Sequence, residues 1–233
     1  MHFSKLKITK HVVLFSFLCT LLATAYLAIK AYGSLAVLAR IGAGEQLPAE
    51  QLQELMLGLS TIEHIASIIV VATAISMLTF LVWLFKSYKN AAFLSKTQAR
   101  FSPYWAVGWF FIPLLNLYKP YQVVQDLWKL TFHEPSQPSF ITQYGPKLIQ
   151  GWWLINIANQ LTSVMTNQAA SQVKGITGQT FAQVGQQYLS LMEWMTLSSL
   201  LSVLVIAGFI LIVFNITEKQ QASYHQLENT LHS

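Results

Sequence analysis

Four polar side chains interrupt one apolar stretch of this chain at helical spacing. They are Asn156, Asn159, Gln160 and Ser163. Separations of three and four residues place them on one face of a helix. In a membrane, such a face could line a path for a polar solute or bind a lipid head group. Polar side chains in membrane helices also commonly hydrogen-bond to a neighbouring helix. We favour this second, structural interpretation.

Titratable side chains form a second candidate site, near the ends of apolar runs. Glu63 and His64 lie together near the start of one run, and Glu193 lies near the start of another. They could form a pH-sensitive pair or a shallow cation site, because histidine titrates near neutral pH. Charged groups at helix ends also reach water at little cost. We favour the interpretation that these three residues are interfacial.

The sequence lacks the usual signatures of catalysis. It contains no HExxH, GxSxG, glycine-rich phosphate loop or CxxC motif. Its six histidines are scattered, and none has a second ligand at metal-binding spacing. No charged residue lies in the middle of an apolar run, whereas proton relays and ion pathways usually contain one. We therefore expect no enzyme activity, no cofactor and no metal site.

The composition indicates an integral membrane protein. The 233 residues are 54% hydrophobic and 10% charged, whereas soluble domains carry roughly 25% charged residues. The net charge of +5 arises from short basic clusters beside apolar runs, where Lys and Arg set membrane orientation rather than bind nucleic acid. The single cysteine, Cys19, cannot form an internal disulfide. We expect one all-α membrane domain over residues 1–233.

Four apolar runs are long enough to cross a bilayer, which requires about 20 residues. We predict spans at about residues 12–30, 62–85, 148–166 and 190–214. The first run could also be a secretory signal peptide with a cleavage site near Ala25. Because the run continues beyond that point, we favour an uncleaved span. Residues 132–147 are marked by Pro and Gly, which predicts an irregular loop.

Residues 103–131 are apolar enough to enter a bilayer but too interrupted to cross it. Ser102 and Pro103 predict a helix start, and Pro113 predicts its end. Beyond Pro120 the pattern is that of a helix lying in the membrane surface. Its expected polar face carries Gln122, Gln125, Asp126 and Lys129. We therefore predict a re-entrant and interfacial helical hairpin. Because lipid cannot satisfy broken backbone, we expect the four spans to enclose it.

The distribution of Lys and Arg predicts the orientation. With four spans, both termini share one side, and that side holds eleven of the fourteen Lys and Arg residues. A fifth crossing through residues 103–131 would divide them eight to six. Because Lys and Arg accumulate in cytoplasmic loops, we predict four spans with both termini in the cytoplasm. The outer side of the cell membrane would then carry Glu63, His64 and Glu193.

A set of aromatic, proline and small residues runs through the middle third of the chain. It consists of Trp83, Asn90, Ser102, Pro103, Trp105, Gly108, Trp109, Pro113, Asn116, Pro120 and Trp128. In order and spacing, this set resembles the uncharacterised family called domain of unknown function 4328. The resemblance implies a multi-pass protein of the bacterial inner membrane. It implies no specific activity.

Two classes of function remain open. We favour a non-catalytic envelope protein that interacts with partners or organises them, because the bundle has short loops and no reactive constellation. The alternative is a component for transport or channelling of a small solute, which would use the polar face of residues 148–166 beside the broken helix. The expected partners are the lipid bilayer and a membrane protein or a second copy of the chain. We expect no nucleic acid partner.

Overall fold

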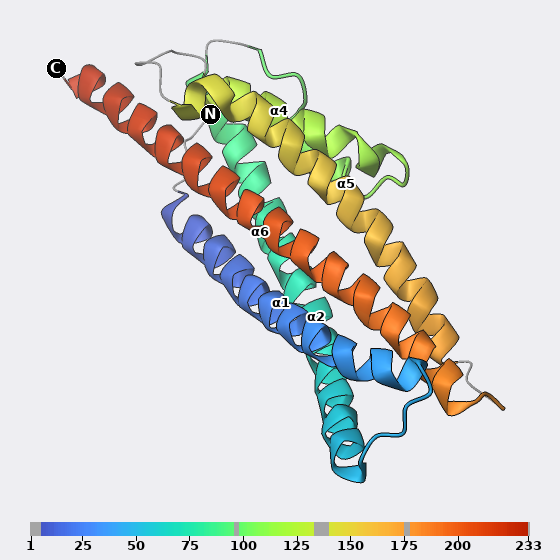
Figure 1. The fold of residues 1–233 in the computed structure, drawn as a ribbon. Helices are drawn as coiled ribbons and strands as arrows, with labels where there is room; N and C mark the ends of the chain where they lie inside the picture. Colours follow the sequence, from blue (N-terminus) through green and yellow to red (C-terminus); the bar gives the residue numbers. More distant parts are fainter. Residues whose placement is uncertain (1–5, 96–97, 133–139, 175–177, 233) are drawn as a thin grey trace. The chain divides into compact units, whose positions relative to one another are not determined.

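The computed structural model describes residues 6–95, 98–132, 140–174 and 178–232, and these residues contain helices but no β-strand. The predicted all-α class is therefore confirmed. In chain order the elements are α1 (Lys7–Gly42), α2 (Ala49–Leu94), α3 (Pro103–Gly108), the 3-10 helix η1 (Leu115–Leu117), α4 (Lys119–Thr131), α5 (Phe140–Lys174) and α6 (Phe181–His232) (Figure 1).

Each predicted span lies inside a longer helix. Among the described helices, α1, α2 and α6 are long and apolar enough to cross a membrane. Helix α5 contains the remaining predicted span, residues 148–166, but is not one of these three. The amides of Asn156, Asn159 and Gln160 lower the hydropathy of α5, so length and composition alone do not mark it as a span.

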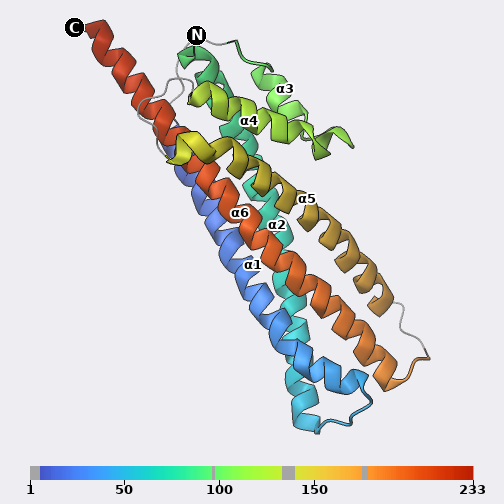
Figure 2. The ribbon, with the colours of Figure 1, turned by 45° about the horizontal axis from the view of Figure 1, so that its top comes forward.

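The irregular loop predicted at residues 132–147 is wrong over its second half. Residues 140–147 form the first turns of α5, with Pro146 inside the helix. The indole of Trp128 on α4 lies directly against Gly145, where a Cβ would collide with it. Helices α4 and α5 lie side by side there (Figures 1 and 2). This packing outweighs the local preference of Pro for a break. Residues 133–139 of the predicted loop lie outside the described residues.

The chain divides into two compact units. Unit 1 comprises Met1–Leu18, Ala74–Leu154 and Ala207–Ser233, and unit 2 comprises Cys19–Thr73 and Ile155–Ile206. Each of the helices α1, α2, α5 and α6 contributes one part to each unit. Helix α3, η1 and α4 belong wholly to unit 1. Unit 1 therefore contains residues 103–131, the interrupted helical region that the sequence singled out, which we call the broken segment.

Unit 2 has an aliphatic core. Its buried members are Leu27, Ala31, Leu38, Ile41, Leu47, Ile62, Ala169, Leu191 and Met192. Helices α1 and α6 approach closely at Gly185, where an added Cβ would lie 2.8 Å from the backbone nitrogen of Gly42. Gln186 Nε2 donates a hydrogen bond to the Gly42 carbonyl at 3.1 Å. A side chain at position 185 would therefore push the two helices apart.

Unit 1 has an aromatic cluster, which we define as Phe17, Phe80, Phe110, Trp152 and Phe209. The ring of Phe209 on α6 lies 4.8 Å from Phe80 on α2 and 4.7 Å from Trp152 on α5. Phe17 on α1 stacks on Phe209 at 5.2 Å, and Phe110 of the broken segment lies 6.0 Å from Phe80. Such pairs contribute about 0.5–1.5 kcal/mol each beyond their burial. The cluster thus joins the broken segment to four helices.

The chain between α3 and α4 is broken by a tight turn at Leu114. Leu114 has φ 65° and ψ −45°, and the Leu115 amide donates to the Pro113 carbonyl at 2.8 Å. This geometry is a γ-turn with positive φ, which is rare and strained for a residue with a Cβ. Helix α3 ends at Gly108, so the helix end predicted at Pro113 is several residues too late.

The expectation that the spans enclose the broken segment is wrong for its tip, residues 111–118. Phe111, Leu114 and Tyr118 are 69%, 82% and 57% exposed. Turns inside the segment satisfy part of its backbone, because the Asn116 amide donates to the Ile112 carbonyl at 2.9 Å and the Tyr118 amide donates to the Leu115 carbonyl at 3.0 Å. Local turns therefore replace much of the cover that we expected from neighbouring helices.

Helix α4 has the predicted amphipathic character with one exception. Val124, Leu127 and Trp128 are buried, and Lys129 is exposed. Gln122, which we expected on the polar face, is buried. Its side-chain oxygen accepts a hydrogen bond from Lys119 Nζ at 3.4 Å, which supplies the partner that a buried amide requires.

Replacement of Leu114 by glycine should raise the free energy of unfolding by about 1 kcal/mol, because the residue with a Cβ is strained at this φ. The exposed Leu114 side chain loses little packing. Leu115→Gly is the matched control, because the φ of Leu115 is not positive, and it should lower stability. Thermal unfolding in a single detergent compares the two variants. A Leu114→Gly protein no more stable than Leu115→Gly would contradict the strained turn.

Candidate functional site

Buried polar contacts join α2, α4 and α6 in unit 1. Trp83 of α2 is fully buried, and its Nε1 donates to Thr217 Oγ1 of α6 at 2.9 Å. One turn further along, Gln220 Nε2 of α6 donates to the Ser87 carbonyl at 3.0 Å. The same nitrogen donates to Thr131 Oγ1 of α4 at 3.1 Å. Because unpaired polar groups are costly in such surroundings, these contacts fix how the three helices pack.

Tyr88 connects α2 to the broken segment. Its hydroxyl donates to the Asp126 carboxylate of α4 and accepts a hydrogen bond from the Phe101 amide at 3.2 Å. The same carboxylate accepts from the Arg100 amide at 3.1 Å. Tyr88 lies beyond the end of the span predicted at 62–85, and burial, followed by the neighbouring carboxylate, raises the pKa of its hydroxyl. Tyr88 therefore stays protonated at neutral pH and remains a donor.

The start of α3 is capped as the sequence predicts. Ser102 Oγ accepts a hydrogen bond from the Trp105 amide at 3.3 Å, and Pro103 occupies the first turn. The rings of Trp105 and Trp109 lie 4.9 Å apart. Lys119 Nζ, from the first turn of α4, lies 5.1 Å above the Trp109 ring, a cation–π contact worth about 0.5–1 kcal/mol. Helices α3 and α4 are thus held together across the break.

Trp153 of α5 supplies a partner to the backbone of the broken segment. Its Nε1 donates to the Leu117 carbonyl of η1 at 3.0 Å. The adjacent Trp152 instead packs in the aromatic cluster, beside Gly208, where a Cβ would collide with its ring. The two neighbouring tryptophans therefore have different contacts, one to backbone and one to core.

The other residues of the set that resembles the family lie either in the interior of unit 1 or in the broken segment. The buried ones are Asn90, Pro120 and Trp128. The exposed ones are Pro113 and Asn116. Gly108 lies at the end of α3, where an added Cβ would come within 3.3 Å of the Trp105 ring. These positions indicate that most residues of the set determine the conformation of the broken segment and its packing in unit 1.

The four residues of the polar face of α5 differ in their surroundings in unit 2. Asn159 Oδ1 accepts a hydrogen bond from Ser202 Oγ of α6 at 3.1 Å, and Ser163 Oγ lies 3.4 Å from Ser198 Oγ of α6. Asn156 is half-buried. Gln160 is exposed. Two of the four residues thus have the geometry of interhelical hydrogen bonding, and their functional role stays a prediction.

The titratable residues Glu63, His64 and Glu193 are all exposed in unit 2. His64 Nδ1 lies 2.7 Å from the Ser60 carbonyl one turn earlier. No salt bridge joins the three residues. Over the described ranges, no group of three His, Cys, Asp or Glu side chains could hold a metal ion. The pH-sensitive pair therefore stays a prediction without support from this geometry.

Sequence reasoning missed Thr217 and Gln220, which lie beyond the last predicted span. Both are almost completely buried. Their separation of three residues places them on one face of α6, and that spacing is the signal that could have found them. Their partners on α2 are more than 130 positions away in the chain, so no local pattern identifies the pairs.

The sequence of the chain matches a known protein family. The family described as domain of unknown function (DUF4328) matches residues 52–218. The chain belongs to this family. The DUF4328 match includes Trp83, Tyr88, Asp126 and Thr217 but neither α1 nor Gln220. Comparison with curated proteins and with solved structures found no match.

Tyr88→Phe should lower the free energy of unfolding of this DUF4328 protein by about 1–2 kcal/mol, because the Asp126 carboxylate and the Phe101 amide each lose a partner. Tyr104→Phe removes the same atom from a side chain that is 78% exposed, and should change stability by less than about 0.5 kcal/mol. Chemical unfolding in mixed micelles measures both. Equal effects of the two substitutions would show that the Tyr88 contact contributes nothing.

Proposed function

We propose that this DUF4328 chain is a multi-pass protein of the bacterial inner membrane, with four spans in α1, α2, α5 and α6 and both termini in the cytoplasm. The apolar character of α1, α2 and α6 supports three of these spans. For α5, the contacts of Asn159 and Ser163 with α6 support a crossing, because polar groups that face a neighbouring helix need not face lipid. The cytoplasmic excess of Lys and Arg supports the orientation.

In this proposal, residues 103–131 form a re-entrant and interfacial hairpin. Its exposed apolar tip, which carries Phe111, Leu114 and Tyr118, enters the boundary between head groups and acyl chains. The amphipathic helix α4 supports this placement, because one face of it packs on unit 1 while Lys129 stays exposed.

The function that we propose is non-catalytic: the protein interacts with partners in the envelope or organises them. One observation carries this proposal. The polar atoms of Trp83, Tyr88 and Trp153 pair with groups of the chain itself, and those of Tyr88 and Trp153 hold the broken segment in place. Catalytic centres instead direct convergent polar groups into a pocket. The segment displays an apolar tip, which suits contact with lipid or with another membrane protein.

The orientation predicts which introduced cysteines react with a membrane-impermeant maleimide in intact cells. In a Cys19→Ala background, Glu50→Cys and Lys174→Cys should react from outside. Lys129→Cys and Lys147→Cys should react only after the membrane is permeabilised. Reaction of Lys147→Cys in intact cells would overturn the four-span arrangement, because a fifth crossing would then precede α5.

Substitutions on the polar face of α5 distinguish the organising role from the transport role. Asn159→Ala should lower the free energy of unfolding by about 0.6 kcal/mol, the typical value for a hydrogen bond between membrane helices. Gln160→Ala is the matched control, because Gln160 is exposed, and it should have no effect. If Asn159→Ala keeps full stability but alters solute flux into reconstituted vesicles, the transport alternative replaces the organising role.

Purification from native membranes tests the proposed role directly. A protein partner in fixed proportion to the chain would support the organising function. Solute flux through vesicles that contain only this protein would contradict it.

A further inference from the structure

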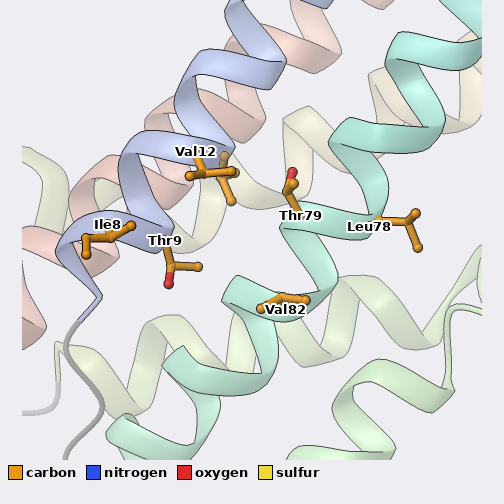
Figure 3. Close-up of a pocket in the computed structure, with 7 residues that line it drawn as sticks. Ile8, Thr9, Val12, Leu78, Thr79 and Val82 are labelled. Atoms are coloured by element: carbon orange, nitrogen blue, oxygen red, sulfur yellow. The ribbon is translucent and has the colours of Figure 1, made fainter.

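Two apolar grooves lie on either side of one ridge of α2 in unit 1. The first has a volume of about 300 Å³ and lies between α1 and α2. Figure 3 shows Ile8, Thr9 and Val12 on α1 and Thr79 and Val82 on α2, which are among the residues that line this groove. The second has a volume of about 390 Å³, lies between α2 and α3, and extends to Tyr104. Both grooves are lined by Leu78 and Val82, which therefore form the ridge between them.

One cation, the ammonium group of Lys86, lies beside both grooves. Lys86 lies one helical turn beyond Val82 on the same face of α2 and lines the second groove. Its Nζ donates to Thr9 Oγ1 of α1 at 3.1 Å, and Thr9 lines the first groove (Figure 3). The ammonium group of Lys86 is therefore positioned where the two grooves meet.

The charge of Lys86 is not balanced by a carboxylate among the described residues. Lys10 of α1 provides a contrast, because its ammonium forms a salt bridge with Glu218 at 2.5 Å. A half-buried ammonium beside apolar walls favours an anion as its partner. The hydroxyl of Thr79, in the first groove, is already bonded to Ser16 and to the Ser76 carbonyl. The grooves thus offer one positive charge and otherwise apolar walls.

We propose that an anionic diacyl phospholipid binds here, with its phosphate against Lys86 and one acyl chain in each groove. Two apolar grooves that meet at one cation match a ligand with two hydrocarbon chains joined at one negative head group. The inference rests on the proposed membrane function and places this lipid in the cytoplasmic leaflet, where anionic lipids attract basic clusters. It assigns Lys86 a specific ligand in addition to its effect on membrane orientation.

Native mass spectrometry tests the head-group contact. The full chain is purified in micelles that contain equal amounts of phosphatidylglycerol and phosphatidylcholine. The natural sequence should retain phosphatidylglycerol about five-fold over phosphatidylcholine, the effect expected of one Lys beside an anionic lipid. Lys86→Gln should abolish the preference, and Lys86→Arg should preserve it. Lys89→Gln is the matched control, because it removes one charge from the same helix but from a residue that lines neither groove, and the preference should remain.

A bulky residue on the ridge tests the two acyl grooves. Val82→Trp should reduce retention of both lipids at least two-fold, because position 82 lines both grooves. Ile75→Trp introduces the same side chain at an exposed position of α2 that lines neither groove, and it should leave retention unchanged. Equal loss in both variants would overturn the groove assignment.

Failure of the lipid site can be distinguished from failure of the proposed function. Equal retention of the two lipids by the natural sequence, or a preference that persists in Lys86→Gln, overturns the lipid site alone. Release of the chain from native membranes by alkaline carbonate overturns the membrane function on which the site rests. Retention of phosphatidylglycerol that depends on Lys86 supports both.

Discussion

A broken helix leaves backbone groups without their helical partners, and unit 1 of this DUF4328 protein supplies partners for several of them. The Leu117 carbonyl is paired with the indole of Trp153, and the Phe101 amide is paired with the hydroxyl of Tyr88. Turns at the tip satisfy further groups, at the cost of positive φ at Leu114. The prolines interrupt the helix, and the aromatic side chains hydrogen-bond to the backbone groups that the interruption leaves unpaired.

Helix α2 contacts its neighbours through different sides in unit 1. The indole of Trp83 is paired with α6, and the hydroxyl of Tyr88 is paired with the broken segment. Leu78, Val82 and Lys86 are spaced four residues apart on a separate side that lines the grooves. The contacts of Trp83 and Tyr88 support this side, because α1 and α3 can flank the grooves only while α2 is held in place. Structure and the proposed lipid contact thus depend on the same helix.

The sequence predicted the long helices well because hydrophobic runs and helical periodicity are local properties. All four predicted spans lie inside helices, and the Ser102 cap and Pro103 start of α3 were also found. The failures occurred where distant contacts outweigh local preference. Pro146 predicted a loop, but Gly145 packs against Trp128 and the segment is helical. Gln122 was expected to face water but is buried.

The amino-acid sequence by itself determined the all-helical class, the apolar runs, the DUF4328 resemblance and the existence of a break near Pro113, because each follows from composition or from neighbours within a few turns. Only the tertiary structure decided that Trp83 meets Thr217, that Tyr88 meets Asp126 and that Lys86 stands where two grooves join. Those pairs join residues on different helices, 38 to 134 positions apart. No local pattern can specify such pairs, because they form only when whole helix faces pack together.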